Sequence, residues 1–449
     1  MVTAVRPKPA PPRLYRFPRF TEEVLPSGLR LVVAPVEKLP VVTILIVVDA
    51  GATIDNAGKE GVAALTADAL LEGTSEFDGV QLTERFEQLG TAVESGADWD
   101  SAFVKLTVLA DRLEEATILL GDAISNPAFP AREVERLKAE RLAEILQLET
   151  EPRGLADEKF SEFLYAVESR YARPEAGSAE SVTALTKADV ESFFRSQYKT
   201  HSTTVVVAGA TTSATARSLI TKAFGGWPAG SGSGRVLVAS PRATARTVNI
   251  VNKPDAPQSE LRVGHVGLPR KHPDFFPTLV MNAVLGGLFG SRINMNLREA
   301  HGYTYGASSY YDWRRGPGPF LVSTAVQSEV TGPALREIFS EIDRIRSEKI
   351  SEEELSLARD YLDGVFPIRY ETTTAIASAL ANLVIYGLSP DYYDTYRTRV
   401  TQITTDDVLK AAKDHLHPDQ LQTVIVGDAG AIKDSVAQLQ LGQLKLHSV

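Results

Sequence analysis

The sequence contains no cysteine among its 449 residues. Disulfide bonds, thiolate nucleophiles and thiolate metal ligands are therefore all excluded, while the cellular compartment is left open. No apolar run reaches the roughly 20 residues that a membrane-spanning helix needs, so no membrane span is expected. The N-terminus is rich in proline and arginine and holds no apolar core of signal-peptide length. We expect a cytoplasmic protein, or a periplasmic one whose signal peptide has been removed.

The sequence also lacks clusters of lysine and arginine interleaved with aromatic residues. Its net charge of −10 and pI near 5.4 arise from charges spread along the chain, which excludes nucleic acid as an expected partner. A chain of this length with 43% hydrophobic residues can bury large cores and should divide into at least two domains. The composition predicts a soluble globular protein.

Alternating and helical hydrophobic periods predict the elements of the first half. Strands are expected over residues 28–35, 41–51, 91–97, 102–109 and 203–208, and helices over residues 58–72, 80–89, 111–124, 131–148, 154–167, 187–198 and 214–224. Residues 1–17 should form an extended arm. Residues 227–246 are rich in glycine, serine and proline and predict a linker.

After this linker the same succession of elements starts again. The segment Val182 to Ala210 aligns without a gap on Val400 to Asp428, and a strand and helix near residues 259–285 stand where residues 41–72 stand in the first half. The two halves therefore look like copies. We expect an α+β fold with two homologous domains, residues 18–226 and 247–449, each an antiparallel-rich sheet covered by helices on one side.

A glycine-rich stretch in the second half is the strongest candidate for a functional segment. Gly286, Gly287 and Gly290 permit backbone conformations and close approaches that a side chain would block, so another chain could lie against them. A Gly-Gly pair is also typical of an ordinary turn. A short helix is expected over residues 291–300, and Gly302 should end it.

Two polar side chains flank the turn after this helix. Arg298 precedes Gly302 and Tyr305 follows it at the start of a β-prone run, so a fixed cation and a phenolic hydroxyl could be aimed at one point. The alternative for each is structural. An isolated arginine is usually a solvated or paired surface charge, and a tyrosine in a strand is usually half-buried packing.

A motif in the first half gives a resemblance to a known family. Residues 61–74 read GVAALTADALLEGT, which is similar to the GxAHxxEHxxxxGT motif of the pitrilysin, insulinase and mitochondrial-processing-peptidase family of zinc peptidases. Ala64 and Asp68 stand at the two histidine positions, and Ala67 stands at the glutamate that activates water. A catalytic zinc needs about three protein ligands and a base beside its open position, and the two alanines supply neither.

The remaining candidate ligands do not restore a zinc site. The family's third ligand matches Glu144, but a single carboxylate on a helix binds no zinc, and a solvated remnant is the simpler interpretation. His415 and His417 form only an isolated H-x-H, and His301 has no evident partner. The sequence therefore predicts no metal in this chain, with degenerate positions at Ala64, Ala67 and Asp68.

The second half resembles the family's zinc-free partners, which carry the motif LRExxGxxY at the end of the glycine-rich stretch. Arg298 and Tyr305 fit this pattern within LREAHGYTY. The resemblance implies that Gly286, Gly287 and Gly290 lie beside the substrate and that Arg298 and Tyr305 reach a zinc held by another chain. Tyr303 is a weaker substrate-binding candidate, expected on the same strand face as Tyr305.

The chemistry of peptide hydrolysis accounts for such a pair. Attack on the peptide builds negative charge on the carbonyl oxygen, and a phenol or guanidinium placed there stabilises the transition state more than the substrate. The sequence thus predicts a subunit of a heterodimeric zinc metallopeptidase, inactive alone, whose HxxEH-bearing homologous partner supplies zinc. The substrate would be a peptide or unfolded protein that adds as a strand to a sheet edge. An inert scaffold and a free-standing peptide-binding subunit remain the alternatives.

Overall fold

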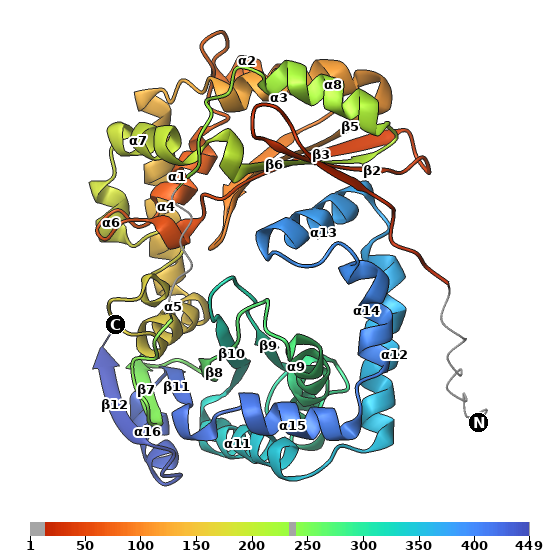
Figure 1. Cartoon of the computed structure of the whole chain (residues 1–449). Helices are drawn as coiled ribbons and strands as arrows, with labels where there is room; N and C mark the ends of the chain where they lie inside the picture. Colours follow the sequence, from red (N-terminus) through yellow and green to blue (C-terminus); the bar gives the residue numbers. More distant parts are fainter. Residues whose placement is uncertain (1–13, 233–238, 449) are drawn as a thin grey trace, which may run out of the picture.

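The computed structural model describes residues 14–232 and 239–448, which form two six-stranded sheets with many helices (Figure 1). Most of the expected arm, residues 1–13, and the middle of the expected linker, residues 233–238, lie outside the described residues. Over the described range, no helix combines the length and the hydropathy that crossing a bilayer requires.

The first sheet is mixed but mostly antiparallel. In spatial order its strands are β1 (Thr21–Val24), β2 (Arg30–Pro35), β6 (Thr203–Gly209), β3 (Val41–Val48), β5 (Ala102–Leu109) and β4 (Val93–Ala97). Only β2 and β6 pair in parallel. The central strands β3 and β6 are buried along nearly their whole length, as their continuous runs of valine, isoleucine and leucine predict.

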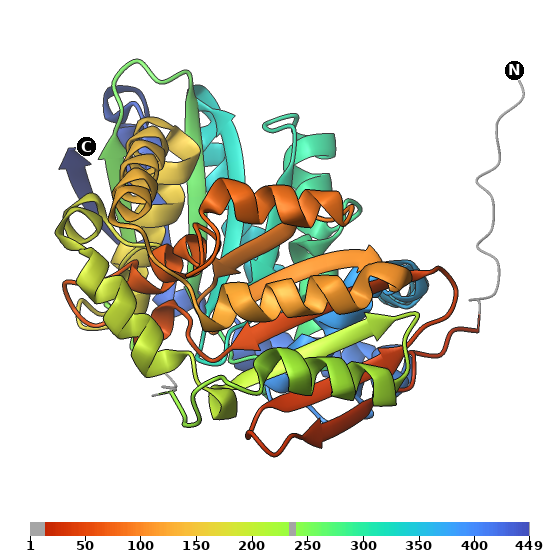
Figure 2. The same ribbon diagram turned by 90° about the horizontal axis from the view of Figure 1, so that it is seen from above.

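The first half also supplies eight longer helices within the described residues. They are α1 (Val62–Ala69), α2 (Gly79–Gln88), α3 (Leu113–Ser125), α4 (Ala131–Thr150), α5 (Pro152–Leu164), α6 (Ala179–Ala184), α7 (Lys187–Gln197) and α8 (Ser213–Phe224). Helices α3 and α8 lie side by side over the outer face of the sheet (Figure 2), where Leu120 and Ile220 pack with Ile44 and Val205.

The second sheet repeats the pairing of the first. In spatial order its strands are β12 (Gln443–Ser448), β7 (Thr247–Asn252), β11 (Gln422–Gly427), β8 (Gln258–Val266), β10 (Pro319–Gln327) and β9 (Ala307–Tyr311). As in the first sheet, one internal pair, β7 with β11, is parallel and the succeeding pairs are antiparallel. Only the outer edge differs, because β12 runs parallel to β7 whereas β1 runs antiparallel to β2.

The repeat extends to the helix caps. Helix α7 starts after Thr186, whose hydroxyl accepts from the Asp189 N–H while the Asp189 carboxylate accepts from the Thr186 N–H. Helix α15 (Thr405–His415) starts in the same way at Thr404 and Asp407. The same reciprocal cap at aligned positions confirms the prediction of two homologous α+β domains.

The other α-helices of the second half, of which α10 is a single turn, surround its sheet and reach the first half. They are α9 (Phe275–Asn282), α10 (Arg292–Asn294), α11 (Thr331–Ser347), α12 (Glu352–Arg369), α13 (Thr373–Ile385), α14 (Tyr392–Thr401) and α16 (Ala429–Ala437).

Each half lends one helix to the sheet of the other. Helix α5 belongs to the first half by sequence, yet Leu155 and Phe160 pack in one cluster with Val424 of β11. Helix α13 comes from the second half and lies against the inner face of the first sheet (Figure 1). There the Thr43 hydroxyl lies 2.8 Å from the Thr373 hydroxyl. Both faces of each sheet are therefore covered, whereas the sequence predicted helices on one side only.

The described end of the N-terminal arm also crosses to the second half. The Phe17 ring stacks on Tyr393 with 4.5 Å between centroids, and the Tyr15 hydroxyl donates to the Tyr370 carbonyl at 2.9 Å. Because these contacts and the exchanged helices join the two halves, the position of the second sheet relative to the first is fixed by buried packing.

Candidate functional site

The glycine-rich segment connects the end of α9 to the start of β9. It contains two π-helical stretches, η5 (Ala283–Gly287) and η6 (Met295–Ala300), on either side of a loop and of the short α10. The expected helix over residues 291–300 is thus present but mostly π-helical, with the His301 N–H donating to the Asn296 carbonyl. Such wide turns often occur at functional sites.

The glycines of this segment first of all permit contacts within the chain. A Cβ atom on Gly286 would lie 2.3 Å from the Ser309 hydroxyl oxygen, so only glycine allows η5 to approach β9. The Asn282 amide and Ser309 hold the same junction by two hydrogen bonds of 3.0 and 2.8 Å. A Cβ on Gly287 or Gly290 would meet less crowded neighbours. Contact of these glycines with a substrate stays a prediction.

A partly buried ion pair anchors the loop between the two π-helical stretches. The Arg292 guanidinium donates to both oxygens of Glu354, on α12, at 2.6 and 3.0 Å. The Asn294 side chain donates to the Phe289 carbonyl at 2.6 Å and accepts from the Ala307 N–H at 3.1 Å. The loop is therefore tied to α12 on one side and to β9 on the other.

Glu354 should make stability depend on acid pH. Burial alone would raise the pKa of Glu354, but hydrogen bonds from Arg292 and from Ser351 lower it to about 2. An unfolded glutamate has a pKa of about 4.3, so this contribution to stability is present above that pH and is lost as the pH falls towards 2. Glu354→Gln should therefore lower the denaturation midpoint at neutral pH and do so progressively less below about pH 4. The adjacent exposed Glu353→Gln is the control; equal behaviour of the two variants would contradict the assignment.

Arg298, in η6, and Tyr305, in the loop before β9, flank one turn; Arg298 is half-buried and Tyr305 is exposed. The Arg298 guanidinium sits over the Phe289 ring, 4.6 Å from its centroid, and its Nη1 lies 3.2 Å from the Glu299 carboxylate. The Tyr305 side chain is 94% exposed. Within the described residues no hydrogen bond links Arg298 to Tyr305, so the phenol is free to meet a group from another molecule.

Gly302 ends the helix, as the sequence predicts, but the chain after Gly302 does not form the predicted strand at once. Gly302 has φ of +65°, a left-handed conformation that glycine adopts without strain. Strand β9 begins only at Ala307, because the Thr304 hydroxyl bonds the N–H and carbonyl of Gly306 and curls this part of the chain. The expectation that Tyr303 lies on a strand with Tyr305 is therefore wrong. Tyr303 instead stacks on the His301 ring at 4.9 Å.

The degenerate motif lies on α1 and gathers no ligand set. Ala67 is buried, Ala64 half-buried and Asp68 exposed. Glu144, at the third-ligand position on α4, is 62% exposed and pairs with Arg141 at 2.9 Å. Among the described residues, the groups of three ligand-bearing side chains that lie close enough to hold an ion do not include any on α1.

The N-terminus of α1 is held by a buried aspartate that sequence reasoning missed. The Asp55 carboxylate accepts from the Gly61 and Ala63 N–H groups at 2.8 and 3.1 Å and pairs with Arg170 at 3.1 Å. Both side chains are almost fully buried. The frame around the lost zinc motif is thus kept rigid by contacts over a long sequence separation, which no local pattern reveals.

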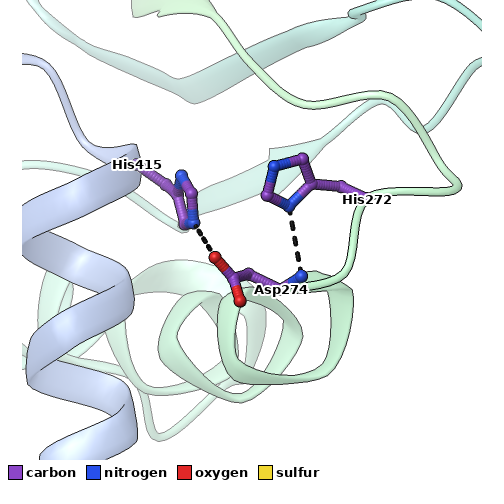
Figure 3. Close-up of side chains that lie close together, drawn as sticks. All are labelled: His272, Asp274 and His415. Atoms are coloured by element: carbon purple, nitrogen blue, oxygen red, sulfur yellow. Dashed lines mark hydrogen bonds and ion pairs between the residues drawn. The ribbon is translucent and has the colours of Figure 1, made fainter.

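A second group that sequence reasoning missed lies in the other half. The His415 Nε2 lies 2.8 Å from the Asp274 carboxylate, and the His272 ring lies beside the side chains of His415 and Asp274 (Figure 3). The contact depends on the packing of α9 against α15. The residues are far apart in sequence, and only their approximate positions in the repeat could have suggested that they meet.

Two homologous sheet-and-helix domains, with a degenerate zinc motif in the first and a glycine-rich segment in the second, define a two-domain chain of the zinc metallopeptidase class. Family models agree: one described as insulinase (peptidase family M16) matches residues 31–173, and one described as peptidase M16 inactive domain matches residues 184–362. The chain belongs to peptidase family M16.

Individual relatives and solved structures cover almost the whole chain. An uncharacterized zinc protease of Mycobacterium tuberculosis is 24% identical over 97% of this chain and 99% of its own. The non-peptidase homolog YmxG of Helicobacter pylori is 22% identical over 84% of this chain and 87% of its own. The beta subunit of the Saccharomyces cerevisiae mitochondrial-processing peptidase is 21% identical over 91% of each chain.

The solved structures show the same fold. A peptidase M16 inactive domain from Pseudomonas fluorescens superposes with a TM-score of 0.87 at 24% identity, covering 92% of this chain and 99% of that one. A putative M16-like peptidase from Alicyclobacillus acidocaldarius has a TM-score of 0.78 at 16% identity, covering 92% of this chain and 99% of that one.

Proposed function

We propose that this chain is the subunit without a catalytic zinc in a two-chain zinc metallopeptidase and that it supplies Arg298 and Tyr305 to the active site. One observation carries the proposal: on α1 the two zinc-ligand positions hold Ala64 and Asp68 and the base position holds Ala67, while a guanidinium and an exposed phenol flank one turn of the second domain. The match to the inactive-domain model supports this division of labour. One relative is named a non-peptidase homolog and another a peptidase subunit.

The roles follow from the chemistry of the two groups. The Tyr305 hydroxyl donates a hydrogen bond to the oxygen that becomes negative as the peptide carbonyl is attacked. Arg298, held by the Phe289 ring, adds a fixed positive charge beside the same oxygen. The HxxEH-bearing partner supplies the zinc and the base, and this chain needs no cofactor for the reaction.

The substrate is an unfolded peptide that pairs with a strand edge. Strand β9 forms one edge of the second sheet and follows the turn that carries Tyr305, although the Asn282 and Asn294 side chains already bond the Ser309 carbonyl and the Ala307 N–H of this strand. Main-chain hydrogen bonds along such an edge bind peptides of many sequences. Gly287, Gly290 and Tyr303 would then contact the peptide on the N-terminal side of this strand, whereas Gly286, predicted as a fourth contact, is buried against Ser309.

An inert scaffold or peptide-binding subunit is the second candidate, favoured by the relative that is named a non-peptidase homolog. A scaffold or peptide-binding subunit would not require the exposed, unpaired hydroxyl of Tyr305. Activity therefore separates the two candidates.

The test is to purify this chain and an HxxEH-bearing homologue from the same source and to assay them singly and mixed. Peptide hydrolysis should appear only in the mixture and should vanish when a chelator removes the partner's zinc. Activity of the partner that is the same with and without this chain would support the scaffold and contradict the proposal.

A further inference from the structure

His272, Asp274 and His415 form a cluster at the junction of two helices in the second domain. His272 lies on the connection from β8 to α9, Asp274 immediately precedes α9, and His415 is the last residue of α15 (Figure 3). His415 is buried, whereas His272 and Asp274 are half-buried. The cluster is therefore set in the protein but open to solvent on one side.

The potential ligand atoms of the three residues converge. The His415 Nε2 lies 2.8 Å from an oxygen of Asp274, and the two imidazole rings are 5.1 Å apart between centroids. One nitrogen or oxygen from each residue lies within 4.8 Å of the others. Within the described residues this is the group of three such side chains that gathers closely enough to hold one ion.

We propose that this cluster binds a divalent transition metal, with zinc as the best-suited ion. Two imidazole nitrogens and one carboxylate oxygen are ligands that zinc commonly takes, at roughly 2.0–2.2 Å, and its remaining positions can hold water. Two ligands at that distance in the tetrahedral arrangement that zinc prefers lie roughly 3.4 Å apart. The His415 Nε2 and the Asp274 oxygen, which are 2.8 Å apart as a hydrogen bond, would therefore move apart by about half an ångström to hold the ion. Magnesium and calcium fit poorly, because they prefer oxygen ligands.

Binding requires small local changes. A carboxylate only accepts hydrogen bonds, so His415 Nε2 carries the proton that points to Asp274; the metal takes the place of that proton, which passes to the ring's Nδ1 or to the buffer. The His272 Nδ1 accepts the Asp274 N–H at 3.1 Å, a hydrogen bond that is given up as the ring turns its lone pair to the ion.

The position of the cluster suggests what the metal does. Helix α9 continues directly into η5 and the glycine-rich segment, and α15 packs along α9. An ion that bridges the start of α9 and the end of α15 would fix the position of α9 and, through it, of the glycine-rich segment that carries Arg298 and Tyr305. This site is separate from the degenerate motif on α1, and it lacks the glutamate base of an HxxEH motif.

Titration of the full chain with zinc chloride tests the proposal. After treatment with EDTA and desalting, the parent should bind one zinc ion saturably in calorimetry, with release of protons to the buffer. His272→Gln should weaken binding at least about 100-fold, since even loss of a residue that orients a ligand costs roughly 10- to 100-fold. His272 is half-buried on a connecting segment, so this variant should fold, and its thermal midpoint without zinc checks that.

Three control variants leave the cluster intact. His201→Gln removes an exposed histidine of the first half, and Asp68→Asn and Glu144→Gln alter the degenerate motif. Each should bind zinc like the parent. Asp274→Asn should match His272→Gln. No saturable zinc binding by the parent, or equal affinity in His272→Gln, would overturn the proposal; loss of binding in Asp68→Asn and Glu144→Gln alone would move the metal to α1.

Discussion

Tyr305→Phe should lower kcat about 100- to 1,000-fold in the assembled two-chain peptidase, the usual cost of losing one oxyanion donor. The substitution removes one hydroxyl from a side chain that is 94% exposed and bonded to no other group in the described structure. Folding and assembly should therefore be unchanged. Substrate binding should change little, because the hydroxyl acts on charge that develops only in the transition state.

The arginine should behave as part of the same unit. Arg298→Ala should also lower kcat, and it should raise KM if the guanidinium holds the carbonyl in the ground state. The double variant should be little worse than the more damaging single one, because both groups act on one oxygen.

Tyr361→Phe provides the matched control, since it removes the hydroxyl of an exposed tyrosine on α12. Its kcat should equal that of the parent. An unchanged kcat for Tyr305→Phe in a complex that assembles normally would remove Tyr305 from the mechanism. A loss of activity that only parallels a loss of assembly would instead assign the residue to the subunit interface.

Asp55→Asn should have the largest effect on folding, lowering the free energy of unfolding by about 3–5 kcal/mol. The change leaves the buried Arg170 guanidinium without its counter-charge, although Arg170 still donates to the carbonyls of Arg173, Pro174 and Glu175. It also weakens the hydrogen bonds that hold the first turn of α1.

Chemical denaturation at about pH 8 measures this effect. Burial raises the pKa of Asp55 to about 6, although Arg170 opposes the rise, so the carboxylate is ionised at the higher pH. Because this pKa lies above the roughly 3.9 of an unfolded aspartate, the stability of the parent falls as the pH rises between these two values, and the measurement at about pH 8 is the stricter test of the pair. Asp111→Asn, at an exposed position, should stay within about 0.5 kcal/mol of the parent. A loss below about 1 kcal/mol for Asp55→Asn would show that the pair contributes no more than an ordinary surface ion pair.

The sequence predicts most of the fold because hydrophobic periodicity can be read in short windows and because the second half repeats the first. Apart from β1 and α6, which were not predicted from the sequence, the strands and longer helices of the first half lie within a few residues of their predicted bounds, and the repeat predicts α15 and β11 from α7 and β6. The exchange of α5 and α13 could not be predicted in this way. The apolar face of a helix shows that the helix is buried, but the spacing of Leu155 and Phe160 says nothing of which sheet they meet.

The candidate site likewise has a part that the sequence predicts and a part that only the structure shows. Glycine spacing and the flanking Arg298 and Tyr305 are contiguous in sequence, so they can be found and placed on one turn without a structure. The π-helical geometry and the curl that removes Tyr303 from β9 depend on hydrogen bonds of Asn282, Asn294 and Thr304. The contacts of Asp55 and His415 close loops of more than a hundred residues, and only the folded chain shows them.

The rate of peptide hydrolysis during titration of this chain into a fixed concentration of its HxxEH-bearing homologue tests the central claim most directly. If this chain, which lacks a catalytic zinc, completes the active site, the rate should rise from near zero and saturate at one chain per partner. The Tyr305→Phe chain should reach the same stoichiometry at a far lower plateau. A rate that stays constant throughout the titration would contradict the account.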